Sequence, residues 1–107
     1  MAAWIGVDLD GTLAKYDEFQ GPRTIGEPVP AMLFKVKQWL RAGKTVKIFT
    51  ARAGYGKPAI DAIKSWLVRN GLPPLEVTDR KDKDCIAIYD DKAFRVETNT
   101  GRILSGG

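Results

Sequence analysis

The sequence predicts a single α/β domain of three layers, in which a parallel β-sheet lies between helices on its two faces. Short β-prone runs alternate with longer runs of helical periodicity, and this alternation is typical of parallel sheets. No repeat, low-complexity tract or linker divides the chain, and 107 residues are too few for two ordinary domains. The hydrophobic content of 44% is enough for one core. We therefore assign residues 1–107 to one domain.

The first strand and the first helix follow from local chemistry. Residues 4–9 form a short β-prone run that ends in acidic residues. A helix is expected from Pro30, because proline suits a first helical turn, and Gly43 ends it. The apolar face of this helix is formed by residues at helical spacing, namely Leu33, Val36 and Leu40.

The remaining elements repeat this alternation and end in a hairpin. A β-prone run with a hydroxyl residue at its end precedes a second amphipathic helix, which Asn70-Gly71 closes. Two further β-prone runs follow, and the tail has two arms around a turn-forming Asn-Thr-Gly. The predicted segments are strand 45–50, helix 58–70, strands 75–77 and 85–89, and hairpin 95–104.

Polar side chains follow three of the predicted strands at the same end. Asp8 and Asp10 close the first strand, Thr50 the second, and Asp90 with Asp91 the strand at 85–89. In open parallel sheets, ligands bind outside the carboxyl ends of the strands. Residues two apart in a strand point to the same side, so the first two carboxylates can converge. We expect all five side chains to meet at one edge of the sheet.

Such a cluster of carboxylates requires a compensating charge. Two ionised carboxylates about 4 Å apart repel each other by about 4 kcal/mol at an effective dielectric constant of about 20. Oxygen ligands without histidine or cysteine suit Mg²⁺, and the chain has no histidine. We predict Mg²⁺ as cofactor, with Asp8, Asp10, Asp90 and Asp91 as its ligands; Asp91 either binds the ion directly or supports another ligand.

Four motifs in order resemble those of the haloacid dehalogenase (HAD) superfamily of phosphohydrolases. Residues 8–12, Asp-Leu-Asp-Gly-Thr, are similar to its first motif, and Thr50 within Ile-Phe-Thr-Ala-Arg to its second. Lys81, which ends the run Val-Thr-Asp-Arg-Lys, resembles the third motif, and residues 90–91 resemble the fourth. The resemblance implies a Rossmann-like, HAD-like fold and a Mg²⁺-dependent phosphomonoester hydrolase.

The resemblance also implies a division of roles between the first two acids. Asp8 attacks phosphorus and forms an aspartyl-phosphate, and Asp10 protonates the leaving oxygen and then activates the hydrolytic water. This division is chemically reasonable, because one carboxylate can attack in line while a second carries the proton as general acid and then as general base. Asp8 and Asp90 also ligate the magnesium ion in this scheme.

Further residues are assigned to the phosphoryl group and the substrate. Thr50 and Gly11, the glycine at which the chain turns sharply, are expected to bind the phosphoryl group. Lys81 balances the charge there, although Lys83 lies only two residues away and remains an alternative. Arg52 is a possible contact for the leaving group, or simply a loop residue; residues 54–56 are predicted as a flexible loop.

The short connections leave no room for a cap domain of the kind that encloses small substrates in related enzymes. Residues 13–29 can form only a small turn and flap, and helix 58–70 occupies the next connection. Capless members of the superfamily accept large substrates or oligomerise to close the site, so a homo-oligomer is possible. Residues 8–15 also resemble the first motif of polynucleotide kinase/phosphatase phosphatase domains, so 3'-phosphorylated nucleic-acid ends stand beside nucleotides and sugar phosphates as candidate substrates.

Charge and hydropathy constrain the partners. The chain has 17 basic and 13 acidic residues and, at +4, suits an anionic, phosphorylated substrate. No apolar run approaches the ~20 residues that span a bilayer, and an aspartate interrupts the first apolar run before it resembles a signal peptide. We expect a soluble, cytoplasmic protein without a membrane partner.

Two other functions fit part of the pattern. Receiver-type phosphoacceptor modules also combine acids, a hydroxyl residue, a lysine and magnesium on a small α/β fold. Their acidic pair comes first and their phosphorylated aspartate in the middle, whereas here the Asp-x-Asp leads and the pair comes last. An inactive binding protein on the same fold is the other alternative, which the intact set of motifs disfavours.

Overall fold

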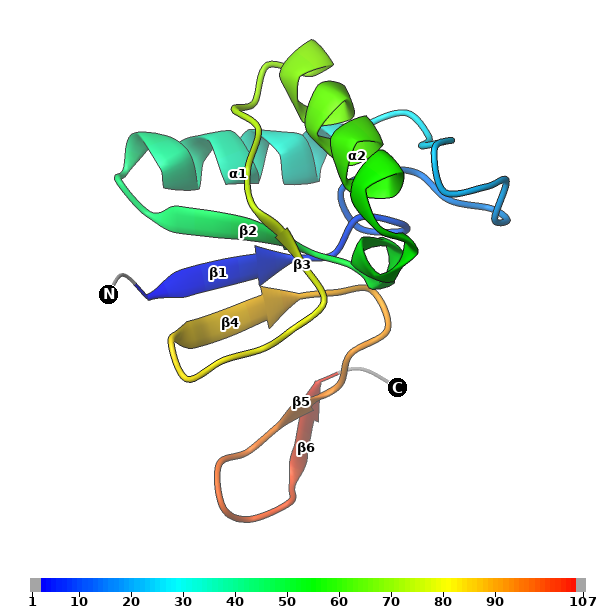
Figure 1. Cartoon of the computed structure of the whole chain (residues 1–107). Coiled ribbons are helices and arrows are strands. Elements are labelled where there is room, and N and C mark those ends of the chain that lie inside the picture. The colour runs from blue at the N-terminus through cyan, green and yellow to red at the C-terminus, as the bar shows by residue number, and fades with distance from the viewer. Residues whose placement is uncertain (1–2, 106–107) are drawn as a thin grey trace.

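A computed structural model describes residues 3–105 and has a four-stranded parallel sheet at its centre (Figure 1). The strands are β1 (Trp4–Val7), β2 (Thr45–Phe49), β3 (Val77–Thr78) and β4 (Cys85–Tyr89), in the spatial order β3-β2-β1-β4. Two helices connect the first three strands, α1 (Pro30–Arg41) and α2 (Lys57–Arg69). A separate antiparallel hairpin follows, with β5 (Arg95–Val96) and β6 (Ile103–Ser105).

The predicted helices, the strands at 45–50 and 85–89 and the hairpin are confirmed to within a few residues; the strand predicted at 75–77 lies at 77–78, and one element is added. Both helices have a proline in their first turn, and α1 ends two residues before Gly43. The addition is a single turn of 3₁₀ helix, η1 (Ala51–Tyr55), where a flexible loop was expected at residues 54–56. Thr50 starts this turn, because its hydroxyl accepts a hydrogen bond from the Arg52 amide at 3.1 Å.

The core lies between one face of the sheet and both helices. Its buried apolar side chains come from alternate positions of β1 and β2 and from the inner faces of α1 and α2; they include Ile5, Val7, Val46, Ile48, Val36, Ile63 and Leu67. The chain steps in one direction from β1 through β2 to β3, and right-handed crossovers in the same direction place their helices on the same face. The parallel α/β sheet is therefore confirmed, and the prediction of helices on both of its faces is not confirmed for residues 3–105.

The return from β3 to β4 explains why no helix of the described residues covers the second face. Residues 79–84 must lead from the carboxyl end of β3 to the amino end of β4, and a chain of this length spans at most roughly 20 Å. It crosses the sheet as an irregular segment (Figure 1). The Trp4 indole, itself 1% exposed, donates a hydrogen bond to the Asp82 carboxylate at 2.9 Å and attaches this segment to β1.

Apolar side chains remain exposed on β4 and the hairpin, away from the helices. They are Ile86, Phe94, Val96, Ile103 and Leu104.

Neither described helix has the length and apolar character that crossing a bilayer requires.

Candidate active site

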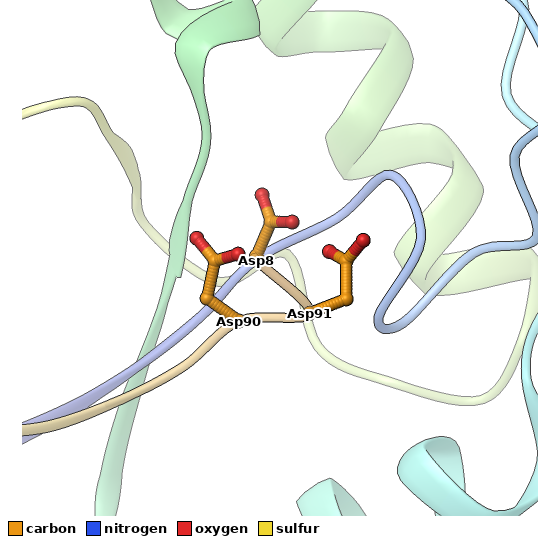
Figure 2. A group of neighbouring side chains, drawn as sticks. All are labelled: Asp8, Asp90 and Asp91. Atoms are coloured by element: carbon orange, nitrogen blue, oxygen red, sulfur yellow. The ribbon is translucent and has the colours of Figure 1, made fainter. Parts of the chain in front are cut away.

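Three carboxylates converge at the carboxyl edge of the sheet. The Asp8 amide donates to the Tyr89 carbonyl at 2.9 Å, which continues the pairing of β1 with β4 and brings Asp8 beside Asp90 and Asp91. One oxygen from each of these three carboxylates lies within 4.8 Å of the other two. Figure 2 shows the three side chains pointing to the same side of the chain. We call these residues the acidic cluster.

Asp91 is held in the acidic cluster by the turn that follows β1. The Thr12 hydroxyl donates to the Asp91 carboxylate at 3.0 Å and accepts from the Asp91 amide at 3.0 Å. Gly11 makes this approach possible, because its φ of +90° suits glycine and an added Cβ would lie 2.6 Å from an Asp91 carboxylate oxygen. The side chain of Asp91 therefore belongs to the cluster, which the sequence left open.

Gly11 differs from its predicted role. Its amide donates to the Ala14 carbonyl at 2.8 Å, so the N–H is already used within the turn and is not directed to a phosphoryl oxygen. The contribution of Gly11 visible in this structure is the space it leaves for Asp91.

The acidic cluster makes the ionised form of Asp8 unfavourable. Partial burial and, after it, the charge of Asp90 raise the pKa of Asp8 from 3.8 to about 7; the hydrogen bond with Asp91 acts in the same direction. In the protein alone, much of Asp8 would therefore be protonated near neutral pH. A bound cation reverses this effect, because it favours the carboxylate form.

The donor set of the cluster fits a hard divalent cation. All three groups are carboxylates whose oxygens lie close together, and oxygen ligands of this kind suit Mg²⁺ and related ions. Asp8 and Asp90 are partly buried, whereas Asp91 is exposed, so water can complete the coordination. The residues that could hold such an ion are thus Asp8, Asp90 and Asp91.

Asp10 is not part of this cluster, contrary to the prediction that it ligates the metal. Arg52 binds both of its carboxylate oxygens, with Nε to Oδ2 at 2.7 Å and Nη2 to Oδ1 at 2.9 Å. The Arg52 side chain is 4% exposed and that of Asp10 is 20% exposed. A bidentate pair that excludes water is among the stronger ionic contacts of proteins. Both carboxylate oxygens of Asp10 are thus bound to Arg52, and Asp10 is not among the three acids whose oxygens converge.

Arg52 is therefore bound within the protein, whereas a contact for the leaving group would need free N–H donors. Its third donor, Nη1, binds the Gly21 carbonyl at 3.1 Å, so the guanidinium is engaged on each side. The sequence reading missed this role because Asp10 and Arg52 are separated by 42 positions and neither lies on a periodic face that predicts the pairing. The turn of η1 immediately after Thr50 brings the Arg52 side chain to Asp10, and no sequence pattern marks this contact.

Thr50 lies where its prediction placed it, at the carboxyl end of β2. It is 4% exposed and lines the same cavity as Asp8 and Asp10. Its hydroxyl oxygen accepts the Arg52 amide, and the hydroxyl proton remains available to a ligand oxygen.

Neither predicted lysine lines this cavity. Lys83 lies just before β4, at the opposite end of the sheet, and its ammonium is 3.2 Å from Asp84. Lys81 lies in the irregular return between β3 and β4 and lines a second cavity, beside β4 and β5, together with Asp90. The lysine that lines the cavity of Asp8 is Lys92, which the sequence reading did not select. Its position directly after Asp90-Asp91 was the available signal.

The cavity above the acidic cluster has a volume of about 820 Å³. Its walls combine the acidic and hydroxyl groups with aromatic rings, and its lining comprises Asp8, Asp10, Tyr16, Phe19, Phe49, Thr50, Ala51, Arg52, Tyr55, Asp79, Asp90 and Lys92. A volume of this order accommodates a ligand well beyond the size of a phosphate ion.

Residues 15–27 form the small flap that the sequence predicted. The flap is closed at its base like a hairpin, because the Lys15 amide donates to the Glu27 carbonyl and the Val29 amide to the Leu13 carbonyl, both at 2.8 Å. The Trp66 indole donates to the Gly26 carbonyl at 2.9 Å and fixes the flap to α2. Arg52 thus connects the flap, through Gly21, with Asp10.

Comparisons with known proteins support the fold and leave the activity open. No family model matches the sequence, and no curated protein matches it. The solved structure of a conserved protein from Bacteroides thetaiotaomicron is similar, with a TM-score of 0.65 and 23% sequence identity. The match covers 98% of this chain and 84% of that one. At this identity the likeness shows that the α/β fold is shared.

Proposed function

We propose that this protein is a Mg²⁺-dependent phosphomonoester hydrolase that acts through an aspartyl-phosphate on Asp8. The observation that carries the proposal is the acidic cluster, whose carboxylate oxygens lie within 4.8 Å beside a cavity of about 820 Å³. The order of the four motifs, which resembles that of the HAD superfamily, supports the same reaction. The fold and the absence of a cap domain within residues 3–105 agree with a small, capless member.

Asp8 is the proposed nucleophile. An oxygen of its carboxylate forms a bond to phosphorus while the bond from phosphorus to the ester oxygen breaks. A magnesium ion held by Asp8, Asp90 and Asp91 would keep Asp8 ionised and offset the negative charge of the phosphoryl group. The Thr50 hydroxyl is suited to donate a hydrogen bond to a phosphoryl oxygen.

Asp10 is the proposed proton carrier, and its contact with Arg52 sets conditions on that role. Both carboxylate oxygens of Asp10 accept hydrogen bonds from Arg52, so the conformation described suits the second step, in which Asp10 accepts a proton from the attacking water as Asp8 is released. In the first step the departing ester oxygen needs a proton. Asp10 can supply it only as a protonated acid that has turned away from Arg52.

Lys92 is the proposed partner of the phosphoryl charge, in place of Lys81. It lines the cavity with Asp8 and Thr50, whereas Lys81 lines the second cavity. Removal of a positive charge that contacts the transferring group lowers kcat/KM. Lys92→Met should therefore lower kcat/KM more than Lys81→Met, and the reverse ranking would return the role to Lys81.

Hydrolysis of p-nitrophenyl phosphate with Mg²⁺ tests the proposal. The wild type should turn over many times, and Asp8→Asn should lower kcat by at least roughly 10³-fold, because the nucleophile is lost. Asp61→Asn makes the same chemical change on the exposed face of α2, where Asp61 pairs with Lys57 at 2.6 Å, and should retain activity.

The outcomes separate the alternatives. Incorporation of one phosphoryl group per chain from acetyl phosphate without turnover would indicate a receiver-like phosphoacceptor. Neither turnover nor phosphorylation would indicate a binding protein on this fold. Activity that survives in Asp8→Asn would exclude the mechanism while leaving a hydrolase.

A further inference from the structure

Three aromatic rings surround the mouth of the cavity without entering the core. Tyr16 and Phe19 belong to the flap and Tyr55 to the end of η1; we call these three residues the aromatic rim. Their side chains are 41%, 46% and 57% exposed, respectively. The apolar core closes without them, since its members come from other positions. Packing of the fold therefore does not account for the aromatic rim.

Two of these rings already stack on each other, so a further flat ring can extend the stack on an outer face. Phe19 and Tyr55 have ring centroids 5.6 Å apart and planes inclined by 17°. They come from different segments of the chain, so their alignment depends on how the flap is attached. The Arg52 guanidinium lies 5.4 Å from the Phe19 ring centroid and also binds the Gly21 carbonyl of the flap. The position of Phe19 is thus fixed by the same residue that holds Asp10.

The aromatic rim is more exposed than the residues at the floor of the cavity. Thr50, at the floor, is 4% exposed and Asp8 is half-buried, whereas the rim rings face solvent. A ligand that reaches both must carry a phosphoryl group and a flat ring joined by a spacer. In an aryl phosphate such as phosphotyrosine, only one oxygen separates the ring from phosphorus. In a nucleotide, a sugar provides the spacer.

The charge of the protein favours the same class of ligand. The chain carries 17 basic and 13 acidic residues, and three of the acids form the cluster at the floor of the cavity. A basic excess outside the site attracts anions and nucleic-acid backbones. Stacking of bases on exposed aromatic side chains, combined with a basic surround, is a common way of binding unpaired nucleotides.

We propose that the aromatic rim binds the base of a base-bearing phosphomonoester, whose phosphoryl group is then directed at Asp8. The proposal rests on the proposed function and specifies its substrate class. The ring of the base extends the stack of Phe19 and Tyr55 on an outer face, and the sugar spans the distance to the floor. Both a nucleoside monophosphate and the phosphorylated end of a single-stranded oligonucleotide present this chemistry.

Kinetics on matched substrates test the assignment. We would measure kcat/KM for adenosine 5'-monophosphate, a 3'-phosphorylated oligonucleotide, phosphotyrosine and β-glycerophosphate, which has no ring. The wild type should prefer one of the two base-bearing substrates over β-glycerophosphate. In Phe19→Ala and in Tyr55→Ala the ratio of these two kcat/KM values should fall roughly tenfold, because base stacking contributes an effect of this order. The preferred base-bearing substrate identifies the source.

Controls make each outcome informative. Phe34→Ala removes a ring that is 59% exposed on α1 and is not among the residues that line the cavity, so the ratio should stay as in the wild type. Phe19→Trp restores a stacking ring and should recover the preference. Equal kcat/KM values for all four substrates, or a preference for phosphotyrosine, would overturn the proposal. Hydrolysis of β-glycerophosphate reports the proposed function separately.

Binding decides the question if no substrate is hydrolysed. Calorimetric titration of Asp8→Asn with adenosine 5'-monophosphate and with the oligonucleotide, in the presence of Mg²⁺, should give a Kd that rises roughly tenfold when Phe19→Ala is added. The same Kd with and without Phe19, or no binding of either compound, would refute base recognition.

Discussion

Asp8 and Asp10 lie two residues apart at the end of the same strand, but their electrostatic surroundings are opposite. Asp10 has a buried guanidinium at 2.7 and 2.9 Å on its two oxygens. Asp8 has two more carboxylates, and partial burial together with their charge raises its pKa to about 7. The protein therefore balances the charge of one acid internally and leaves the other unbalanced.

The difference indicates which acid depends on a ligand from solution. A carboxylate with its own guanidinium is fixed in position whether or not a cation is present. The acidic cluster, in contrast, favours any cation that reduces its repulsion, and such a cation favours the ionised form of Asp8. Under the proposed mechanism, the proton carrier Asp10 is therefore held in place by Arg52, whereas the nucleophile Asp8 depends on a metal ion for its activation. The predictions below are ordered from the largest expected effect to the smallest.

Removal of the Arg52 guanidinium tests how much the ion pair with Asp10 contributes to stability. Arg52→Met keeps the length of the side chain but leaves the Asp10 carboxylate without its partner, and breaking such a pair costs about 3 kcal/mol. Urea denaturation should show this decrease in the free energy of unfolding. Lys47→Met provides the control, because Lys47 pairs with the exposed Glu76 at 3.3 Å. Equal losses in the two variants would show that the Asp10 pair is an ordinary surface contact.

The titration of Asp8 should make the stability of the metal-free protein depend on pH. The pKa of Asp8 rises from 3.8 to about 7 on folding, so between these values the folded state retains a proton that the unfolded chain has released. The free energy of unfolding should therefore fall as pH rises through this window, by about 2 kcal/mol after allowance for solvent at this half-buried group. Below pH 4 the contribution is fully present, and above pH 7 it is lost.

Comparison of the wild type with Asp8→Asn isolates this contribution from those of other acids. The difference between their free energies of unfolding, measured with a chelator present, should change across the window in the direction given. Millimolar Mg²⁺ should raise the melting temperature of the wild type and remove most of its excess pH dependence, because the ion binds the folded state. A difference that stays constant from pH 4 to pH 7 would show that Asp8 titrates normally.

Gly11→Ala should move Asp91 away from Asp8 and so reduce the difference between the surroundings of Asp8 and Asp10. The added methyl group would lie 2.6 Å from an Asp91 oxygen, and the φ of +90° is unfavourable for alanine. Gly43→Ala is a matched control, because Gly43 has a φ of +80° but no atom within 4 Å of the added carbon. Gly11→Ala should be the less stable by roughly 1 kcal/mol. It should also require more Mg²⁺ for half-maximal thermal stabilisation, whereas equal behaviour would leave Asp91 without a role in binding the ion.

Much of the scaffold was predictable because it depends on local patterns. Apolar periodicity located both helices, and polar residues after β1, β2 and β4 predicted where Asp8, Thr50 and Asp90 meet. The layer arrangement was not, because it depends on whether the return from β3 to β4 contains a helix. The short spacing from Thr78 to Cys85 was the available clue.

The finer arrangement of the site depends on contacts that have no sequence pattern. Arg52 is one of 17 basic residues, and only the three-dimensional turn of η1 brings it to Asp10. Lys81 was chosen by its place in a motif order, but without a helix after β3 it follows the irregular return to the second cavity. The stacking of Phe19 on Tyr55 likewise arises where two loops meet.

The order β3-β2-β1-β4 also affects how this chain folds while it is being translated. β1 is buried along its whole length and needs neighbours on both sides, yet its partner β4 begins only at Cys85. At ribosomal speeds of about 5–20 residues per second, roughly 4 to 16 s pass between translation of the two strands. During that interval, one edge of an apolar strand is open to pairing with other chains. Nascent chains that stall before Tyr89 should therefore depend on chaperones more than completed ones.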